Sequence, residues 1–212
     1  EIPQADVAVL SGPSHAEEVG KGLPTTIVAG AHSRETAERI QGYFMSPVFR
    51  VYTSSDMLGI ETGAALKNVI ALAAGMADGL GYGDNTKAAL ITRGIHEIAR
   101  LGVKMGGALE SFMGLTGIGD LIVTCASDHL RIRKAGYLMG QGKTMQEAMD
   151  EVKMVVEGVY STKAAVALGK KYGVDLPIIE QVNAILFEGK NAKEAVYDLM
   201  MRKGKAEHNA KP

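Results

Sequence analysis

The sequence predicts a mainly α-helical fold, in which a multi-helix domain follows a short β-α-β segment. Three observations point to this class. Strand and helix signals alternate over residues 1–56 only. From residue 57 onward, apolar residues recur at the three- and four-residue steps of helices. The first of these helices, residues 57–80, is strongly apolar and carries a single lysine in its central stretch.

The first 56 residues contain three strand-like runs of apolar and β-branched residues, at 7–10, 25–28 and 49–52. A helix is expected between the last two runs, at residues 33–40, because Ser33 has the side chain of an N-cap. The resulting β-α-β segment is too small for a complete doubly wound sheet. Together with the abrupt start of the chain, this leads us to expect that residues 1–56 are the last strands of a larger domain.

Helical periodicity covers most of the remaining chain. The predicted helices span residues 57–80, 85–105, 107–113, 117–125, 129–140, 144–152, 156–172, 176–188 and 191–202. Residues typical of caps lie near their starts (Asn85, Thr144, Asp175, Asn191) and near their ends (Gly106, Gly140, Gly173, Gly189). We expect residues 57–202 to form one helical domain and the polar residues 203–212 to form a frayed tail.

The composition is that of an ordinary globular protein, with 212 residues, 46% of them hydrophobic and 22% charged. The net charge is −1 with both signs dispersed, which argues against nucleic acid or an anionic membrane as a partner. The most apolar run, residues 62–77, is shorter than the ~20 residues of a membrane-spanning helix. We therefore interpret it as core and expect no stable membrane insertion.

The cysteine and the histidines exclude some kinds of site. Cys125 is the only cysteine, so an internal disulfide and a cysteine-based zinc site are excluded. The five histidines are far apart and form no recognisable ligand pattern, so we predict no metal. The amino terminus lacks the basic and apolar regions of a signal peptide. These features are typical of a protein of the reducing cytoplasm.

The apolar helix around Lys67 contains the first candidate group. Lys67 is the only charged residue between Glu61 and Asp78, and its neighbours one turn away, such as Gly63, cannot neutralise it. Their small size is expected to leave room for a ligand. Burying an ammonium group without a partner costs several kcal/mol and favours proton exchange near neutral pH, so Lys67 is a candidate general acid or base. The alternative is a lysine whose stem crosses the apolar face to reach water.

A second candidate group follows at Asp120 and Thr124, which share one helical face amid apolar residues. A buried carboxylate needs a cation, and Lys67 needs an anion. We therefore expect Asp120 to pair with Lys67. The alternative is that Asp120, which follows a glycine, is an N-cap.

Two weaker signals suggest an anion site. Arg131, Arg133 and Lys134 form the densest basic cluster outside the tail, and a guanidinium group suits bidentate binding of a phosphate. The alternative is a solvated helix face. The Ser-Gly-Pro-Ser turn at residues 11–14 places backbone N–H groups where an anion could bind, although such turns are common. Neither glycine-rich stretch, at residues 79–84 or 117–120, has a complete dinucleotide fingerprint.

Four linked motifs carry a family resemblance. They are residues 10–19 (Leu-Ser-Gly-Pro-Ser-His-Ala-Glu-Glu-Val), 61–71 (Glu-Thr-Gly-Ala-Ala-Leu-Lys-Asn-Val-Ile-Ala), 119–125 (Gly-Asp-Leu-Ile-Val-Thr-Cys) and 155–159 (Val-Val-Glu-Gly-Val). In order and spacing they resemble the bacterial NAD(P)-dependent glycerol-3-phosphate dehydrogenases. The resemblance spans nearly the whole chain but covers only the carboxyl-terminal part of that family, without the nucleotide-binding half.

The resemblance implies a helical domain of the 6-phosphogluconate-dehydrogenase C-terminal type, preceded by a remnant of a Rossmann-like nucleotide-binding sheet. It also implies an enzyme of the cytoplasm that reduces dihydroxyacetone phosphate to sn-glycerol 3-phosphate with NAD(P)H, for glycerophospholipid synthesis. In the family, the helical domain supplies the substrate site. The isolated chain is expected to be inactive without the missing half.

Carried over residue by residue, the resemblance implies that Lys67 accepts the proton in oxidation and donates it in reduction, with Asp120 and Thr124 as its polar companions. Arg131 is implied to hold the substrate phosphate close to the cofactor. The implied substrate-binding residues are Gly12, Ser14, Lys67, Asn68, Asp120, Leu130, Arg131 and Ile132. The implied cofactor-binding residues are Ala16, Arg131, Val155 and Glu157.

One departure from the family pattern concerns the phosphate. The family usually has serine and asparagine on either side of the arginine, where this chain has Leu130 and Ile132. Two polar groups are therefore missing, so Arg131 acts alone or with Arg133. Two alternatives stay open: a related dehydrogenase that acts on another hydroxy acid, and a helical interaction module without activity. The sequence also leaves open the choice between NADH and NADPH and the formation of a homodimer.

Overall fold

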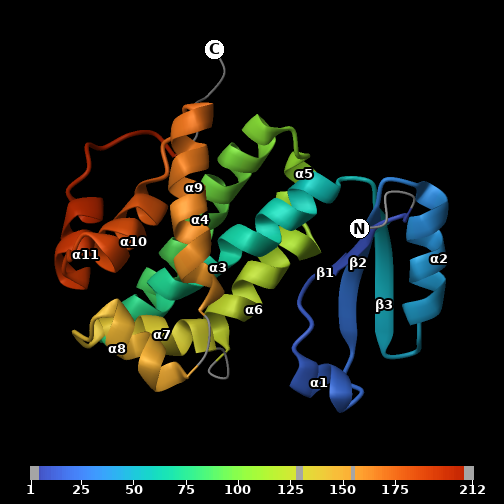
Figure 1. The fold of residues 1–212 in the computed structure, drawn as a ribbon, viewed down its shortest axis with the longest axis horizontal. Helices are drawn as coiled ribbons and strands as arrows, with labels where there is room; N and C mark the ends of the chain where they lie inside the picture. Colours follow the sequence, from blue (N-terminus) through green and yellow to red (C-terminus); the bar gives the residue numbers. More distant parts are fainter. Residues whose placement is uncertain (1–4, 128–130, 154–155, 208–212) are drawn as a thin grey trace.

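The structure is a computed structural model that describes residues 5–127, 131–153 and 156–207. A small sheet stands at one end and a helical bundle at the other (Figure 1). The sheet part contains β1 (Ala8–Ser11), α1 (Ala16–Gly20), β2 (Thr25–Ala31), α2 (Arg34–Phe44) and β3 (Phe49–Ser54). The bundle contains α3 (Met57–Gly79), α4 (Asp84–Met105), α5 (Leu109–Met113), the π-helical turn η1 (Leu115–Gly119), α6 (Asp120–Ala126), α7 (Arg131–Gly140), α8 (Met145–Val152), α9 (Glu157–Tyr172), α10 (Pro177–Phe187) and α11 (Ala192–Met200). The predicted mainly α fold is confirmed.

The three strands form one sheet in the order β1-β2-β3. β2 and β3 are parallel and are joined by α2, which is the predicted β-α-β unit, while β1 runs antiparallel beside β2. Ser33 caps α2 as expected, because its side chain accepts a hydrogen bond from the backbone N–H of Thr36. Ile27, Ala29 and Val51 are buried between the sheet and its neighbours.

The helix α3 is the core of the bundle, with α4, α6, α7 and α9 packed around it (Figure 1). Residues 69–72 of this helix are completely buried. Leu58 and Ala65 are exposed because they lie on the solvent-facing side of α3. By length and composition α3 could also cross a membrane, so the argument from a short apolar run does not hold. However, 72% of its most apolar window is buried, which favours a core helix.

Most of the residues predicted to cap helices lie at helix ends in the structure. Thr144 begins α8 with a complete capping box, and Asn191 caps α11. Asn85 lies inside α4, which begins one residue earlier than predicted. Asp175 does not cap α10 either, because the backbone N–H groups at the start of that helix donate to the buried carboxylate of Glu97.

Asp56 fixes the junction between the sheet and the bundle. It caps α3 by accepting a hydrogen bond from the backbone N–H of Gly59 at 2.9 Å. The same carboxylate accepts hydrogen bonds from the backbone N–H of Ala108 and the hydroxyl of Ser111, which hold α5 against α3. Burial is the largest single influence on the pKa of Asp56 and would raise it, but the three hydrogen bonds together hold the pKa below its usual value.

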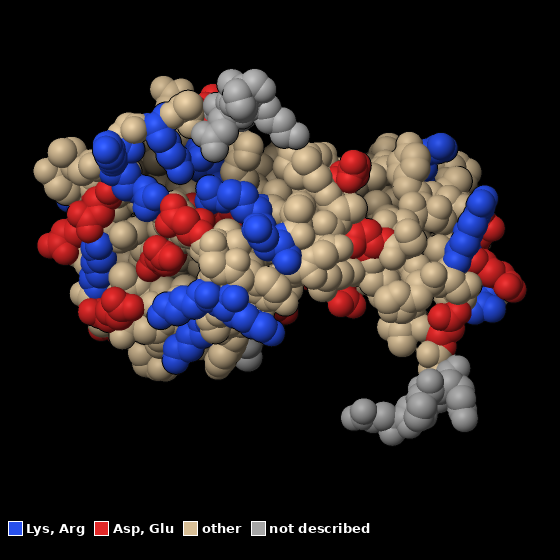
Figure 2. Space-filling model, turned by 90° about the horizontal axis from the view of Figure 1, so that it is seen from above, with Lys and Arg blue, Asp and Glu red and all other residues tan. Residues whose placement is uncertain are grey.

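Basic and acidic side chains are interspersed over the face of the molecule in Figure 2. Some charged side chains of the protein form ion pairs, among them Arg34 with Glu38 and Lys190 with Asp198. In the predicted tail, residues 203–207 are exposed and belong to neither a helix nor a strand. Residues 208–212 lie outside the described part of the chain.

Candidate active site

The ammonium group of Lys67 and the carboxylate of Asp120 form the centre of the candidate site. Lys67 lies midway along α3, Asp120 is the first residue of α6, and Nζ donates to Oδ2 at 2.5 Å. The side chain of Asp120 is 6% exposed and that of Lys67 is 20% exposed. The structure therefore brings the two charges together as expected, and it leaves part of the lysine side chain accessible to a small molecule. A lysine that only reaches for water would not be held in this way.

Thr124 supports the carboxylate from one turn further along α6. Its Oγ1 donates to the backbone oxygen of Asp120 at 2.6 Å and lies 3.5 Å from Oδ1 of the same residue. Both residues are buried. Asp120 is a residue of the helix rather than its N-cap, which is Gly119. The alternative interpretation of Asp120 as a cap is therefore wrong.

The small residues beside Lys67 were expected to leave room for a ligand, but at Gly63 the structure shows close packing instead. A Cβ on Gly63 would lie 2.9 Å from the backbone oxygen of Thr116 in η1. Gly63 therefore does not leave room for a ligand. Its missing side chain instead lets η1 approach α3, which brings Asp120 to Lys67. A π-helical turn of this kind is often found at functional sites.

Asn68, which follows Lys67, connects α3 to the start of α9. Its Nδ2 donates to Oε2 of Glu157 at 3.3 Å, and Asn68 itself is buried. The two helices approach closely here, because a Cβ on Gly158 would lie 2.7 Å from the backbone oxygen of Asn68. A residue predicted to bind substrate is thus in contact with Glu157, an exposed residue predicted to bind cofactor.

The turn after β1 places Gly12 and Ser14 near the same region. Gly12 has φ +138°, which favours glycine, and a Cβ there would lie 3.1 Å from the Cα of Ile27. The hydroxyl of Ser14 donates to the backbone oxygen of Gly12 at 3.0 Å, which orders the turn. A Cβ on Gly119 would lie 3.9 Å from Cδ of Pro13. The turn therefore adjoins the residue that precedes Asp120.

The remaining predicted residues lie at the starts of helices or outside the described residues. Arg131 is the exposed first residue of α7, and Ala16 is the exposed first residue of α1. Ile132 packs against the hydrophobic core of the bundle, so an apolar side chain is accommodated there without forming a surface patch. Leu130 and Val155 are not among the described residues.

The sequence did not indicate the structural roles of two acidic residues, Asp78 and Glu97. Arg133 donates through Nε to Oδ2 of Asp78 at 2.8 Å, so the structure does not place it as a second phosphate ligand beside Arg131. Glu97 is 2% exposed, and burial raises the pKa of its carboxyl group to about 7 against the opposing hydrogen bonds from α10. In the sequence, Arg93 and Arg100 lie one helical turn to either side of Glu97, so it is not marked as a lone charge in the way that Lys67 is.

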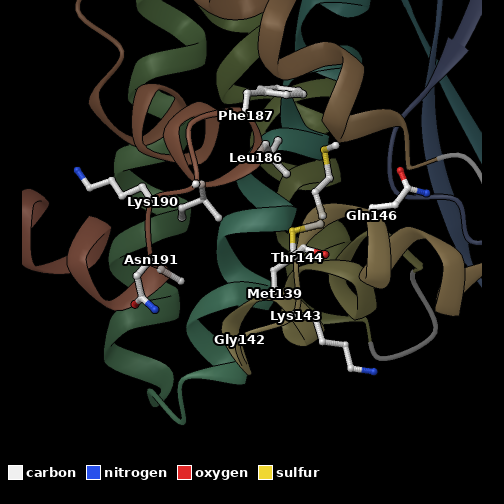
Figure 3. Close-up of a pocket in the computed structure, with 13 residues that line it drawn as sticks. Met139, Gly142, Lys143, Thr144, Gln146, Leu186, Phe187, Lys190 and Asn191 are labelled. Carbon is white, nitrogen blue, oxygen red and sulfur yellow. The ribbon is translucent and has the colours of Figure 1, made fainter.

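A cavity of about 410 Å³ lies away from Lys67, between the α7–α8 turn and the α10–α11 turn (Figure 3). Thr144 and Asn191 at its edge cap their own helices, and Lys143 and Lys190 are paired with carboxylates. In Figure 3 the two lysines extend away from each other. Among the described residues, none of those predicted for the site lines this cavity, and we assign it no function.

Cys125 lies in α6, the helix that begins with Asp120. Cys125 is buried in α6, and burial raises the pKa of its thiol to about 12, which makes it unreactive near neutral pH. No cluster of three or more potential metal ligands occurs within residues 5–127, 131–153 and 156–207.

Comparison with known proteins agrees with this geometry. Residues 56–197 match the sequence model described as NAD-dependent glycerol-3-phosphate dehydrogenase C-terminus, and residues 1–37 match the model of the N-terminus. The chain belongs to the NAD-dependent glycerol-3-phosphate dehydrogenase family.

Individual members of the glycerol-3-phosphate dehydrogenase family align with almost the whole chain. The glycerol-3-phosphate dehydrogenase [NAD(P)+] of Agathobacter rectalis is 69% identical over 210 residues, which are 99% of this chain and 62% of the relative. That of Fusobacterium nucleatum is 69% identical over 201 residues, or 95% of this chain and 60% of the relative. The crystal structure of glycerol-3-phosphate dehydrogenase from Coxiella burnetii is 38% identical with a TM-score of 0.90, covering 94% of this chain and 61% of that one. The chain spans about three fifths of the length of these relatives.

Proposed function

We propose that this chain is the substrate-binding and catalytic part of an enzyme that reduces dihydroxyacetone phosphate to sn-glycerol 3-phosphate with NAD(P)H, in the cytoplasm, for glycerophospholipid synthesis. Residues 57–202 are the helical substrate domain in this proposal, and residues 1–56 belong to the nucleotide-binding domain. The observation that carries the proposal is the ion pair between Lys67 and the buried Asp120, in which the side chain of Lys67 is still 20% exposed. Family membership and the names of the relatives support the same reaction.

In the proposed mechanism, Lys67 manages the proton at the C2 oxygen of the substrate. During reduction its ammonium group donates a hydrogen bond to the C2 carbonyl and then the proton itself, as negative charge develops on that oxygen. During oxidation the neutral amine accepts the proton of the C2 hydroxyl. Asp120 holds the ammonium group in place and stabilises its charge, and Thr124 in turn orders Asp120.

The substrate phosphate is proposed to bind Arg131 at the start of α7. A guanidinium group can donate two parallel hydrogen bonds to a phosphate. The turn with Gly12 and Ser14, which adjoins the start of α6, and the amide of Asn68 are proposed to contact the glycerol part of the substrate. Because Arg131 has the apolar Leu130 and Ile132 on either side of it in the sequence, Arg131 is proposed to carry most of the phosphate binding.

The described residues fit one edge of a nicotinamide cofactor rather than the whole of it. Ala16 and Glu157 are exposed at the starts of two helices, and Glu157 contacts Asn68 beside Lys67. Together with Arg131 and Val155 they are proposed to meet the cofactor. Neither glycine-rich stretch of the chain offers a complete cradle for the cofactor phosphates. When bound, NAD(P)H supplies the hydride that is transferred to C2.

The test compares the chain alone with a fusion enzyme, in which the chain follows the amino-terminal part of the Agathobacter rectalis relative. The chain alone, mixed with dihydroxyacetone phosphate and NADPH, should not consume NADPH. The fusion enzyme should consume it. Steady oxidation by the chain alone would contradict the need for the missing part. A fusion enzyme that folds and binds NADPH but does not reduce dihydroxyacetone phosphate would contradict the proposed reaction.

A second measurement separates this function from a dehydrogenase of another hydroxy acid. The fusion enzyme should reduce dihydroxyacetone phosphate far better than dihydroxyacetone, because the phosphate contributes charge-assisted hydrogen bonds to Arg131. Arg131→Ala should remove this preference mainly through a higher KM for the phosphorylated substrate. Equal use of both substrates by the unmodified fusion enzyme would favour the other dehydrogenase.

A further inference from the structure

Three helices meet at the carboxylate of Asp78, near the end of α3. Its Oδ2 lies 2.8 Å from both Nε and Nη2 of Arg133 on α7. Its Oδ1 lies 3.1 Å from Nζ of Lys87 on α4. The three side chains are only 13%, 18% and 23% exposed, in the order Asp78, Arg133, Lys87. Partly buried charges of this kind are screened by salt much less than exposed ones.

The cluster lies where α7 is in backbone contact with α3. A Cβ on Gly75 would lie 2.2 Å from the backbone oxygen of Arg133, and a Cβ on Gly136 would lie 2.3 Å from that of Leu72. With the backbones this close, side-chain movements cannot absorb a shift of one helix against the other. The contact between Asp78 and Arg133 joins the first turn of α7 to α3 within this close interface.

The position of α7 decides where Arg131 stands relative to Lys67. Arg131 begins α7 and shares the first turn of this helix with Arg133. Lys67 lies on α3 about three helical turns before Asp78. Binding of a phosphate by a guanidinium group depends on both distance and angle, so a displaced first turn of α7 would weaken it.

We propose that Asp78 is a positioning residue for the substrate phosphate. By holding Arg133, it fixes the first turn of α7 so that Arg131 reaches the phosphate of a substrate whose C2 oxygen lies at Lys67. This inference rests on the function proposed above. It assigns Arg133 a role other than phosphate binding, because two of its nitrogens face a carboxylate that would repel a bound phosphate. Lys87 balances the charge of that carboxylate.

The first test is calorimetric titration of the chain with glycerol 3-phosphate. The unmodified chain should bind it, and Asp78→Asn should weaken the affinity about tenfold, the order expected when one charge-assisted contact is misplaced. In the fusion enzyme the same substitution should raise KM for dihydroxyacetone phosphate and leave KM for NADPH unchanged. A general loss of structure would instead affect both constants and the thermal unfolding midpoint, which is measured on the same samples.

Two control variants separate position from charge. Lys87→Met leaves the contact between Asp78 and Arg133 intact and should retain the unmodified affinity. The double variant Asp78→Asn/Lys87→Met has the original net charge of the cluster but lacks the contact, so it should bind as weakly as Asp78→Asn. If Asp78→Asn does not fold, Arg133→Lys tests the same contact, because a lysine cannot place two donors on the carboxylate.

The outcomes distinguish the two proposals. Unmodified affinity in Asp78→Asn, in the double variant or in Arg133→Lys would overturn the positioning role of Asp78. A lack of glycerol 3-phosphate binding by the unmodified chain, together with an inactive fusion enzyme, would overturn the proposed function itself.

Discussion

Replacing Glu97 by glutamine should make the stability of the fold depend less on pH between about 4.5 and 7. The carboxylate of Glu97 is 2% exposed and accepts hydrogen bonds from the backbone N–H groups of Ile178 and Ile179 at 2.8–3.2 Å. Burial is the largest influence on its pKa and raises it from 4.5 to about 7. The folded protein therefore holds a proton that the unfolded chain has already lost in this range of pH.

The sign and size of the effect follow from this shift. Because the folded state binds the proton more tightly, Glu97 contributes its stabilisation below pH 4.5, and this contribution is lost as the pH rises to about 7. Each unit of pKa shift corresponds to about 1.4 kcal/mol, so the loss amounts to about 3 kcal/mol. Above pH 7 the contribution of Glu97 should be constant.

The assay is urea unfolding at pH 5 and pH 8, followed by circular dichroism. The fall in the free energy of unfolding between these pH values should be smaller by about 3 kcal/mol in Glu97→Gln than in the unmodified chain. Glu147→Gln is the matched control: Glu147 also binds the start of a helix but has a lowered pKa, so it should not alter the difference. An unchanged pH dependence in Glu97→Gln would refute the reasoning.

Three further outcomes are expected. In the fusion enzyme, Asp120→Asn should lower kcat about tenfold or more, because Lys67 loses the carboxylate that orients it; an unchanged kcat in steady-state kinetics would contradict this role. Gly63→Ala should destabilise the chain by roughly 1–3 kcal/mol in urea unfolding, because the new methyl group meets the backbone oxygen of Thr116. Asp56→Ala should lower the free energy of unfolding by roughly 1–2 kcal/mol at neutral pH. This loss should become smaller as the pH falls below about 4, because the hydrogen bonds that lower the pKa of Asp56 stabilise the fold only while its carboxyl group is ionised.

The pairing of Lys67 with Asp120 could be predicted because each is a lone charge in an apolar stretch. Because an unpaired buried charge is costly, two such residues are expected to pair even when they are far apart in the sequence. The burial of Glu97 could not be predicted in this way, because Arg93 and Arg100 lie one turn to either side of it in the sequence. Its partners in the structure are backbone N–H groups of α10, which no side-chain pattern marks. Thr144 was predicted to cap its helix and does so, whereas Asp175, predicted near the start of α10, does not cap it, because the N–H groups there bind the distant carboxylate of Glu97.

The features that could not be predicted depend on the approach of one backbone to another. Spacing along a helix shows that Gly63 is beside Lys67, but not that the π-helical turn η1 fills the space next to it. In the same way, Arg131 and Arg133 form one basic cluster in the sequence. The structure separates them, because Asp78 on α3 holds Arg133.

The most direct test of the central claim is kcat of Lys67→Ala in the fusion enzyme. The account predicts a loss of roughly 10²–10⁴-fold, the usual contribution of general acid–base catalysis, with an unchanged circular dichroism spectrum and unchanged NADPH binding. Lys193→Ala, which removes an exposed lysine of α11, should retain full activity as a control. A near-normal kcat in Lys67→Ala would contradict the assignment of Lys67 as the proton donor.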